Sequence, residues 1–174
     1  MKRMFLYLFS ISLFCSCELL IEDPKPLYLQ RQEYSGNHLK INGYYSQIDN
    51  NEIRTIYLFY QNGIVFSAGS PNKSLNEADN YVQSLASNRS RRQYCYDWGV
   101  FIIDSIKIKF ERWYPGYPFP SYVRAGEIIN DSTFLINESY RMINGQKTEV
   151  QAKNETYYFR AFSPKPDSTN IYIK

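Results

Sequence analysis

The sequence predicts an all-β protein, namely an antiparallel, up-and-down barrel of eight strands with one amphipathic helix inserted. Short runs in which apolar and polar residues alternate recur along the chain, as expected for strands with one buried face. Turn signals separate these runs, and aromatic residues, which favour strands, make up 17% of the chain. No strand alternates with helices as in parallel sheets. A meander of such strands removes its free edges by closing into a barrel.

Residues 1–16 have the pattern of an export signal. Lys2 and Arg3 give a positive start, and Met4–Phe14 is apolar apart from two serines. As a helix, about 11 residues span only about 16 Å, which is roughly half of a bilayer's hydrocarbon core. A short apolar run of this kind is typical of a secretory signal rather than of a transmembrane helix.

The signal ends at two cysteines, of which Cys17 resembles the lipidated cysteine of bacterial lipoproteins. In the lipobox of that family a small residue precedes the cysteine. Ser16 fits this position before Cys17, whereas Phe14 before Cys15 is too large. The resemblance implies cleavage after Ser16 and a diacylglyceryl group on the Cys17 thiol; an ordinary cleaved signal is the alternative. Glu18 rather than Asp comes next, which by analogy favours the outer membrane, on either its periplasmic or its surface side.

The charge of the mature chain limits its partners. The whole chain has a net charge of +3, and loss of Lys2 and Arg3 with the signal leaves about +1. This is not the strong basic field of nucleic-acid binders, so no nucleic acid is expected as a partner. Only Cys95 accompanies Cys17 in the mature chain, so no intramolecular disulfide framework is expected, although the envelope compartment would permit one.

Residues 17–36 are expected to form a tether between the lipid and a folded domain over residues 37–174. Pro24 and Pro26 interrupt regular structure there. Three strands are predicted at the start of the domain: Leu39–Ser46, Arg54–Gln61 and Ile64–Ala68. Asn62-Gly63 between the last two is a strong hairpin signal, because both residues accept a positive φ.

One helix interrupts the strands at Asn72–Asn88. Ser74 with Glu77 three residues later forms a capping box, which satisfies free amides at the start of a helix. The apolar residues of the segment recur at helical spacing and define one face: Leu75, Ala78, Val82 and Leu85. We expect this face to cover part of the sheet.

Five further strands complete the predicted eight: Trp98–Ile103, Ile106–Trp113, Tyr122–Ile129, Thr133–Tyr140 and Thr156–Phe162. The second of these alternates cleanly. Ile106, Ile108 and Phe110 point to a buried face, while the two lysines and the glutamate between and after them point to water.

The domain resembles the lipocalin-like, or calycin-like, lipoproteins of Gram-negative bacteria, many of which have no known function. Four stretches carry the resemblance: LKINGYY (39–45), WGVFIIDSIKIKF (98–110), GEIINDSTFLI (126–136) and YYFRAFSPKPDSTN (157–170). The Gly-x-Trp signature of true lipocalins is incomplete, because Gly43 is followed by Tyr44 and Tyr45. The resemblance implies a barrel with a lipid anchor and does not imply a cargo.

Residues for catalysis are scarce. The single histidine, His38, lies at the end of the predicted tether, where it is expected to be an exposed linker residue. One histidine and one distant cysteine do not make a zinc site, which needs several nitrogen or sulfur ligands at set spacing. The sequence contains no glycine-rich phosphate loop and no nucleophile elbow. We therefore expect no enzymatic activity, no cofactor and no metal.

The stretch WYPGYPFPSY holds five aromatic residues, and these are the candidate binding residues: Trp113, Tyr114, Tyr117, Phe119 and Tyr122. Aromatic faces on a stiff loop can stack on sugars or bind a partner. Without a bulge in its strand, Trp113 shares the wet face of Lys107 and Lys109, and it is therefore expected to be exposed beside Tyr117 and Phe119. The alternative is a loop that folds back to plug the end of the barrel.

Three Asp-Ser-x triplets resemble an O-glycosylation signal that some Gram-negative bacteria use on exported proteins. The candidate acceptors are Ser105, Ser132 and Ser168. Asp and Ser are also ordinary turn residues, and all three triplets are predicted in turns. The structural alternative is therefore that they only shape the turns.

Two classes of function stay open for this lipid-anchored envelope protein. In the first, the barrel is a binding module for a small apolar or amphipathic ligand or a glycan. In the second, it is a filled barrel that serves as a structural or interaction subunit of an envelope complex, with another envelope protein as partner. An apolar pocket of about 300 Å³ or more would favour the first class, and a packed interior would favour the second.

Overall fold

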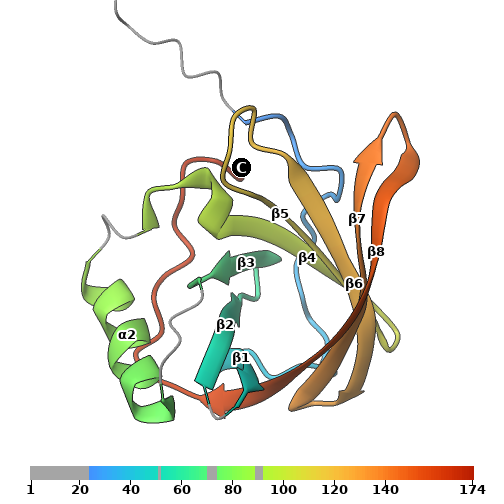
Figure 1. The fold of residues 1–174 in the computed structure, drawn as a ribbon. Helices are drawn as coiled ribbons and strands as arrows, with labels where there is room; N and C mark the ends of the chain where they lie inside the picture. Colours follow the sequence, from blue (N-terminus) through green and yellow to red (C-terminus); the bar gives the residue numbers. More distant parts are fainter. Residues whose placement is uncertain (1–23, 51, 70–73, 89–91) are drawn as a thin grey trace, which may run out of the picture.

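The computed structural model describes residues 24–50, 52–69, 74–88 and 92–174, which form a closed antiparallel barrel of eight strands (Figure 1). The strands are β1 Gly43–Asp49, β2 Glu52–Phe59, β3 Ile64–Ser67, β4 Trp98–Asp104, β5 Lys107–Trp113, β6 Ser121–Asn130, β7 Thr133–Ile143 and β8 Gln146–Ala161. Each strand pairs with the next along the chain, and β1 pairs with β8. The predicted all-β, up-and-down barrel is therefore confirmed.

The helix α2, Leu75–Ser87, lies outside the barrel (Figure 1). The predicted capping box is present, and the Ser74 amide donates to the Glu77 carboxylate at 3.0 Å. The buried face of the helix packs on outward-facing residues of β1 to β4, as predicted, but Leu75 at the start of the helix is exposed and does not belong to it. Asp79 links the helix to the first and the last strand. Its carboxylate accepts hydrogen bonds from the Tyr44 hydroxyl of β1 at 2.7 Å and from Arg160 Nε of β8 at 2.8 Å.

β7 and β8 form a long hairpin that projects beyond the neighbouring strands (Figure 1). β8 begins at Gln146, well before the strand start predicted at Thr156. Asn144 and Gly145 form the turn with φ values of 50° and 76°. Both values are positive, as the tightest hairpin turns require. This part of the hairpin was not predicted because residues 146–155 are mostly polar, and Val150 and Ala152 are the only apolar residues among them.

Two large clusters of buried residues hold the fold together, and a third cluster, of Val123, Ala125 and Tyr140, is small. The inner cluster fills the barrel and consists mainly of rings and aliphatic side chains from the inward faces of the strands: Tyr45, Tyr57, Phe59, Val65, Phe101, Ile108, Phe110, Ile128, Phe134, Ile136 and Tyr157. The outer cluster joins α2 to the sheet: Tyr44, Ile53, Ile56, Leu58, Tyr60, Ile64, Phe66, Ala68, Ala78, Val82, Leu85 and Trp98. Alternate residues of β2 and β3 enter different clusters, as the period of two requires.

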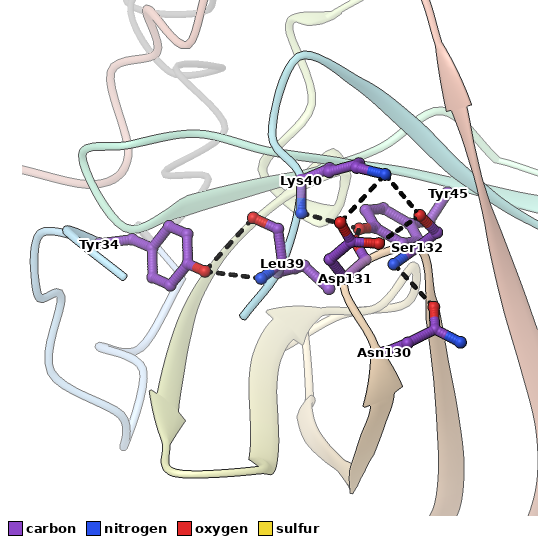
Figure 2. Close-up of polar contacts among 7 residues, drawn as sticks. All are labelled: Tyr34, Leu39, Lys40, Tyr45, Asn130, Asp131 and Ser132. Carbon is purple, nitrogen blue, oxygen red and sulfur yellow. Dashed lines mark hydrogen bonds and ion pairs between the residues drawn. The ribbon is translucent and has the colours of Figure 1, made fainter. Parts of the chain in front are cut away.

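Residues 34–42 close one end of the barrel, which we call the plugged end. Tyr34 and Leu39 are buried and belong to the inner cluster. The Tyr34 hydroxyl accepts a hydrogen bond from the Leu39 amide at 2.7 Å and donates one to the Leu39 carbonyl at 3.3 Å. The Tyr45 hydroxyl of β1 donates to the Asp131 carbonyl in the β6–β7 turn at 2.8 Å. Lys40 holds the incoming chain against this turn, because its amide donates to the Asp131 carbonyl at 3.0 Å and its Nζ donates to Ser132 Oγ at 2.8 Å (Figure 2).

The described part of the predicted tether lies against the outside of β5. The Leu29 amide donates to Glu111 Oε2 at 2.7 Å, and Trp113 Nε1 donates to the Lys25 carbonyl at 2.8 Å. Residues 24–36 are therefore packed on the domain. Because Leu29 lies over it, Glu111 is only 1% exposed, so the prediction that this glutamate points to water is wrong. A spacer role stays a prediction for residues 17–23, which lie outside the described residues, as does the signal over residues 1–16.

Candidate binding site

The inward-facing residues of the barrel change from rings to polar groups along its axis. We call the end opposite the plug the polar end. Residues directly opposite each other on antiparallel strands point to the same side of the sheet, and Arg124 lies opposite the inward-facing Phe110. Ser139 in turn lies opposite Arg124, and Ser67 lies opposite Tyr57. These residues therefore point into the barrel.

Arg124 of β6 is one of two arginines at the polar end, and it is only 9% exposed. Its Nη2 forms an ion pair with Oε2 of Glu155 on β8. The Tyr157 hydroxyl donates to the same oxygen at 2.8 Å. Burial raises the pKa of Tyr157, so the phenol stays neutral and remains a donor. Glu155 is therefore compensated by Arg124 and held in place by Tyr157.

Arg112 of β5 is the second arginine, and it follows Ile108 and Phe110 on the inward face of the strand. Its Nη1 donates to the Tyr96 carbonyl at 2.8 Å. The guanidinium carbon lies 4.2 Å from the centroid of the Tyr114 ring, where the face of the ring attracts a cation. The loop between β5 and β6 thus contacts the site through Tyr114.

The second acidic residue of the polar end is Asp97, which ends the 3-10 helix Cys95–Asp97 and lies near Arg112. Burial raises the pKa of Asp97 to about 7, although the Arg112 charge lowers it. The carboxyl is therefore only partly ionised at neutral pH, and it offsets the charge of Arg112 only in part.

The two arginines retain unused hydrogen-bonding capacity. Nε of Arg112 and Nε of Arg124 are both buried and have no hydrogen-bond partner among the described residues. A buried donor without a partner costs roughly 1–3 kcal/mol. Two guanidinium charges against Glu155 and a partly protonated Asp97 leave this end of the interior net positive. Such a site can accept a small anionic group, because the planar guanidinium matches carboxylate and similar oxyanions.

The plugged half of the interior, in contrast, is filled by its own side chains. The ring of Phe59 lies 5.0 Å from that of Phe101 and 5.8 Å from those of Phe110 and Phe134, measured between centroids. Phe134 stacks on Tyr157 at 4.9 Å. These are contact distances for aromatic pairs. An apolar ligand would have to displace these rings to enter.

The predicted binding loop is only partly exposed. Tyr117 is 69% exposed, whereas Tyr114, Phe119 and Tyr122 are half-buried. The Tyr122 hydroxyl donates to Glu149 on the projecting hairpin, and its ring lies edge-on to Tyr114 at 5.1 Å. Among these residues, Tyr117 is therefore the ring most available to a partner.

The expectation that Trp113 is exposed is wrong, because the side chain is only 3% exposed. Its strand parity is as predicted, since Trp113 lies on the same outward face of β5 as Lys107 and Lys109. Segments distant in sequence cover it. The Lys25 carbonyl accepts its indole N–H, and the Tyr172 ring packs against it at 6.3 Å. The alternation of residues within one strand cannot predict that segments distant in sequence bury a side chain on its outward face.

The other predicted site residues are scattered over the molecule. Ser105 is exposed in the β4–β5 turn. The Ser132 hydroxyl is already bound, because it accepts from Lys40 Nζ at 2.8 Å and donates to Asp131 at 2.6 Å. Ser168 Oγ accepts from the Asn62 amide at 3.0 Å. Ser105 therefore offers the freest acceptor of the three, and its modification stays a prediction; Cys17 lies outside the described residues.

Arg112, Arg124 and Glu155 were not predicted from the sequence. For Arg112 a signal exists, because it continues the inward series Ile108, Phe110, whose parity was predicted correctly. Arg124 lies in a predicted strand without assigned faces. Glu155 precedes the predicted start of the last strand, so its position depends on the hairpin that was missed.

Comparisons of the chain with family models, with curated proteins and with solved structures found no match. The likeness to lipocalin-like lipoproteins therefore stays a prediction. Among the described residues, no three or more His, Cys, Asp and Glu side chains group as metal ligands, and no helix has the length and apolar character to cross a membrane. His38 is exposed, as predicted.

Proposed function

We propose that the protein is a lipocalin-like lipoprotein of the outer membrane, held by lipid on Cys17, and that its barrel is a non-enzymatic binding module. The ligand is a small amphipathic molecule or glycan with an acidic group, which binds at the polar end. One observation carries this proposal: the buried Arg124 and the half-buried Arg112 each have a buried Nε donor without a hydrogen-bond partner among the described residues. The carboxylate of Glu155 is already paired with Arg124.

The physical reason is the cost of buried charge. A buried ion is tolerated only when a counter-charge and hydrogen bonds replace its water shell. Arg124 is paired with the carboxylate of Glu155. Arg112 instead contacts backbone carbonyl groups and the face of the Tyr114 ring, and the nearby Asp97 is only partly ionised. An oxyanion between the arginines would supply the missing charge and acceptors. The half-buried Tyr114 beside it offers a face to the apolar part of a ligand.

A filled barrel that serves as a structural or interaction subunit is the second candidate. The aromatic packing of the plugged half supports it, because that half has the density of a core rather than of a cargo site. The two candidates differ at the polar end. The first needs anion binding there, and the second does not.

Calorimetric titration with matched probes separates the two candidates. We expect glucuronate and decanoate to bind, and glucose and decanol to bind at least tenfold more weakly. Arg112→Gln should lose the acid preference, whereas Arg54→Gln, which changes a half-buried arginine of β2 that is already paired with Asp49 and Glu52, should keep it. Circular dichroism checks that both variants are folded. Absence of acid binding, or equal binding of the neutral probes, would leave the filled-barrel subunit as the better proposal.

The anchor has its own test. Cys17→Ser should release the protein from the membrane fraction, because firm anchoring needs more than one acyl chain and the diacylglyceryl group supplies two. Cys15→Ser is the matched control and should change little. If the Cys17→Ser protein still pellets with membranes after a salt wash, the lipoprotein assignment fails.

A further inference from the structure

Four segments far apart in the sequence meet outside the polar end of the barrel. Trp113 Nε1 donates to the Lys25 carbonyl at 2.8 Å, and the Trp113 ring packs on Tyr172 at 6.3 Å. The Tyr172 hydroxyl donates to the Gln93 carbonyl at 2.5 Å. The start of the described chain, the C-terminus and the β5–β6 loop consequently lie side by side (Figure 1). We call this face, made of residues 24–31, 93–96, 113–121 and 170–174, the terminal face.

Large apolar and aromatic side chains are exposed on the terminal face. Ile171 is 83% exposed, Tyr117 is 69% exposed and Tyr28 is 54% exposed. Between the N-terminal segment and the C-terminal tail lies an open groove of about 280 Å³, whose lining includes Pro24, Leu27 and Ile173. Exposed apolar groups that gather on one face mark an interaction surface.

The charged side chains of the terminal face are basic. Lys25, Arg31 and Lys174 are exposed, and the four segments contain no acidic side chain. Tyrosines together with lysine and arginine are the residues that membrane proteins place at the lipid headgroups, because a phenol is apolar at one end and polar at the other. Basic side chains are in addition attracted to anionic headgroups.

The length of chain before the described residues decides which partner fits. Cys17 and Pro24 are seven residues apart in sequence, and a fully extended chain of that length spans at most about 25 Å. Lys25 is fixed on the terminal face by its bond to Trp113. A lipid on Cys17 would therefore keep this face within about 25 Å of the membrane. The β4–β5 turn at Ser105 lies at the other end of β5, one strand length further away.

We propose that the terminal face is a membrane-contacting surface, which docks the domain onto the anionic headgroups of the leaflet that holds the Cys17 lipid. This rests on the proposed lipid anchor. The exposed rings and Ile171 would enter the headgroup layer while the three cations meet phosphate groups. The polar end of the barrel would then face the membrane, and the turn at Ser105 would face away from it.

A quenching experiment on the full lipidated protein tests this orientation. Tyr117→Cys and the matched control Ser105→Cys, both at exposed positions, are labelled with a fluorophore; the native Cys95 is buried and Cys17 carries the lipid. The proteins are incorporated into vesicles of phosphatidylethanolamine and phosphatidylglycerol that contain a headgroup nitroxide. We expect at least twofold stronger quenching at position 117 than at position 105. Reversal of Lys25, Arg31 and Lys174 to Glu should reduce that difference.

Flotation of the same vesicles keeps the two proposals apart. If the protein floats with the vesicles but both labels are quenched equally, or position 105 is quenched more, the anchor stands and the docking surface is wrong. If the protein does not float, the anchor itself fails and the docking proposal falls with it. If the label at position 117 escapes the nitroxide yet is shielded from aqueous iodide in native envelopes, a protein partner covers the face instead, which also overturns the proposal.

Discussion

The plugged half and the polar half of the barrel interior are built from the same strands but differ in how completely their groups are satisfied. β5 contributes Ile108 and Phe110 to the rings and then Arg112 to the polar end. β8 contributes Tyr157 to the rings and Glu155 to the polar end. In the plugged half each ring has close partners. In the polar half two buried donors lack them.

This difference separates stability from function. Apolar side chains that pack at crystal-like density stabilise a fold, whereas buried ions are weak contributors because desolvation offsets their attraction. Groups that break the rule of local satisfaction are expected where a protein binds something. The plugged half is therefore expected to dominate the free energy of unfolding, and the polar half to dominate ligand binding.

The largest effect is expected from Phe134→Ala in the plugged half. Phe134 is fully buried and stacks on Tyr157. Removal of the ring should lower the free energy of unfolding by about 3–5 kcal/mol, as buried Phe-to-Ala changes do. Urea denaturation measures the change. Tyr158→Ala, at an exposed position of β8, is the control and should cost under about 0.5 kcal/mol. A loss below about 1.5 kcal/mol for Phe134→Ala would indicate a loose interior that could admit a ligand.

The packed half and the helix outside the barrel are the regions that sequence reasoning predicted best. Alternation placed Ile108 and Phe110 on the inward face of β5, and the capping box placed the start of α2 at Ser74. Both signals are local, because strand parity and helix caps depend on neighbours a few residues away. Ile106, in contrast, is exposed in the β4–β5 turn, since the turn lies one residue later than predicted.

The polar half and the terminal face depend on contacts between distant residues, and there sequence reasoning failed. Trp113 has the expected parity, but a segment that starts at Pro24 and the tail with Tyr172 cover it. The pairing of Arg124 with Glu155 requires the register between β6, β7 and β8. Asn144-Gly145 is a turn signal of the same kind as Asn62-Gly63, and it could have predicted this hairpin. It was overlooked because the residues after it are mostly polar and do not resemble a strand with one buried face.

The second effect concerns the ion pair of the polar half. Arg124→Met leaves Glu155 half-buried without its counter-charge, and we expect a loss of about 3 kcal/mol. The double variant Arg124→Met, Glu155→Met removes both charges and should lie within about 1.5 kcal/mol of the wild type. Thermal and urea unfolding of the wild type, Arg124→Met, Glu155→Met and the double variant completes a double-mutant cycle. A single variant as stable as the double one would show that the pair is solvated, and the contrast between the halves would then be weaker.

A smaller, pH-dependent effect is expected at Asp97. Burial raises the pKa of Asp97 to about 7, so between pH 4 and pH 7 the folded state holds a proton that the unfolded state has lost. This contribution to stability is complete below about pH 4 and disappears as the pH rises through 7. Asp97→Asn should therefore gain stability relative to the wild type between pH 5 and pH 8. We expect about 1.3 kcal/mol, roughly half of the about 2.7 kcal/mol that the shift alone would give over this pH range, because solvent screens the partly exposed carboxyl.

Chemical denaturation of both proteins at the two pH values measures this gain. Asp104→Asn, in the exposed β4–β5 turn, is the control and should show no such gain. A constant difference between Asp97→Asn and the wild type would mean that Asp97 is charged at both pH values. Arg112 would then be fully compensated, and the polar end would have less need of an anion.

The smallest effect on stability is expected in the β5–β6 loop. The same test decides whether this loop is an interaction surface or a plug of the barrel end. Tyr117 is 69% exposed and lies edge-on to the half-buried Phe119 at 6.5 Å. Replacement of both by Ser should cost under about 1.5 kcal/mol, as surface changes do, yet abolish binding to a partner, glycan or membrane through this loop. Trp113→Ala, four residues before Tyr117 but at a buried position, is the contrasting control and should cost about 3–5 kcal/mol. If the double Ser variant instead loses 3 kcal/mol or more, Tyr117 and Phe119 belong to the core. The loop would then be a plug for the polar end, and both ends of the barrel would be closed.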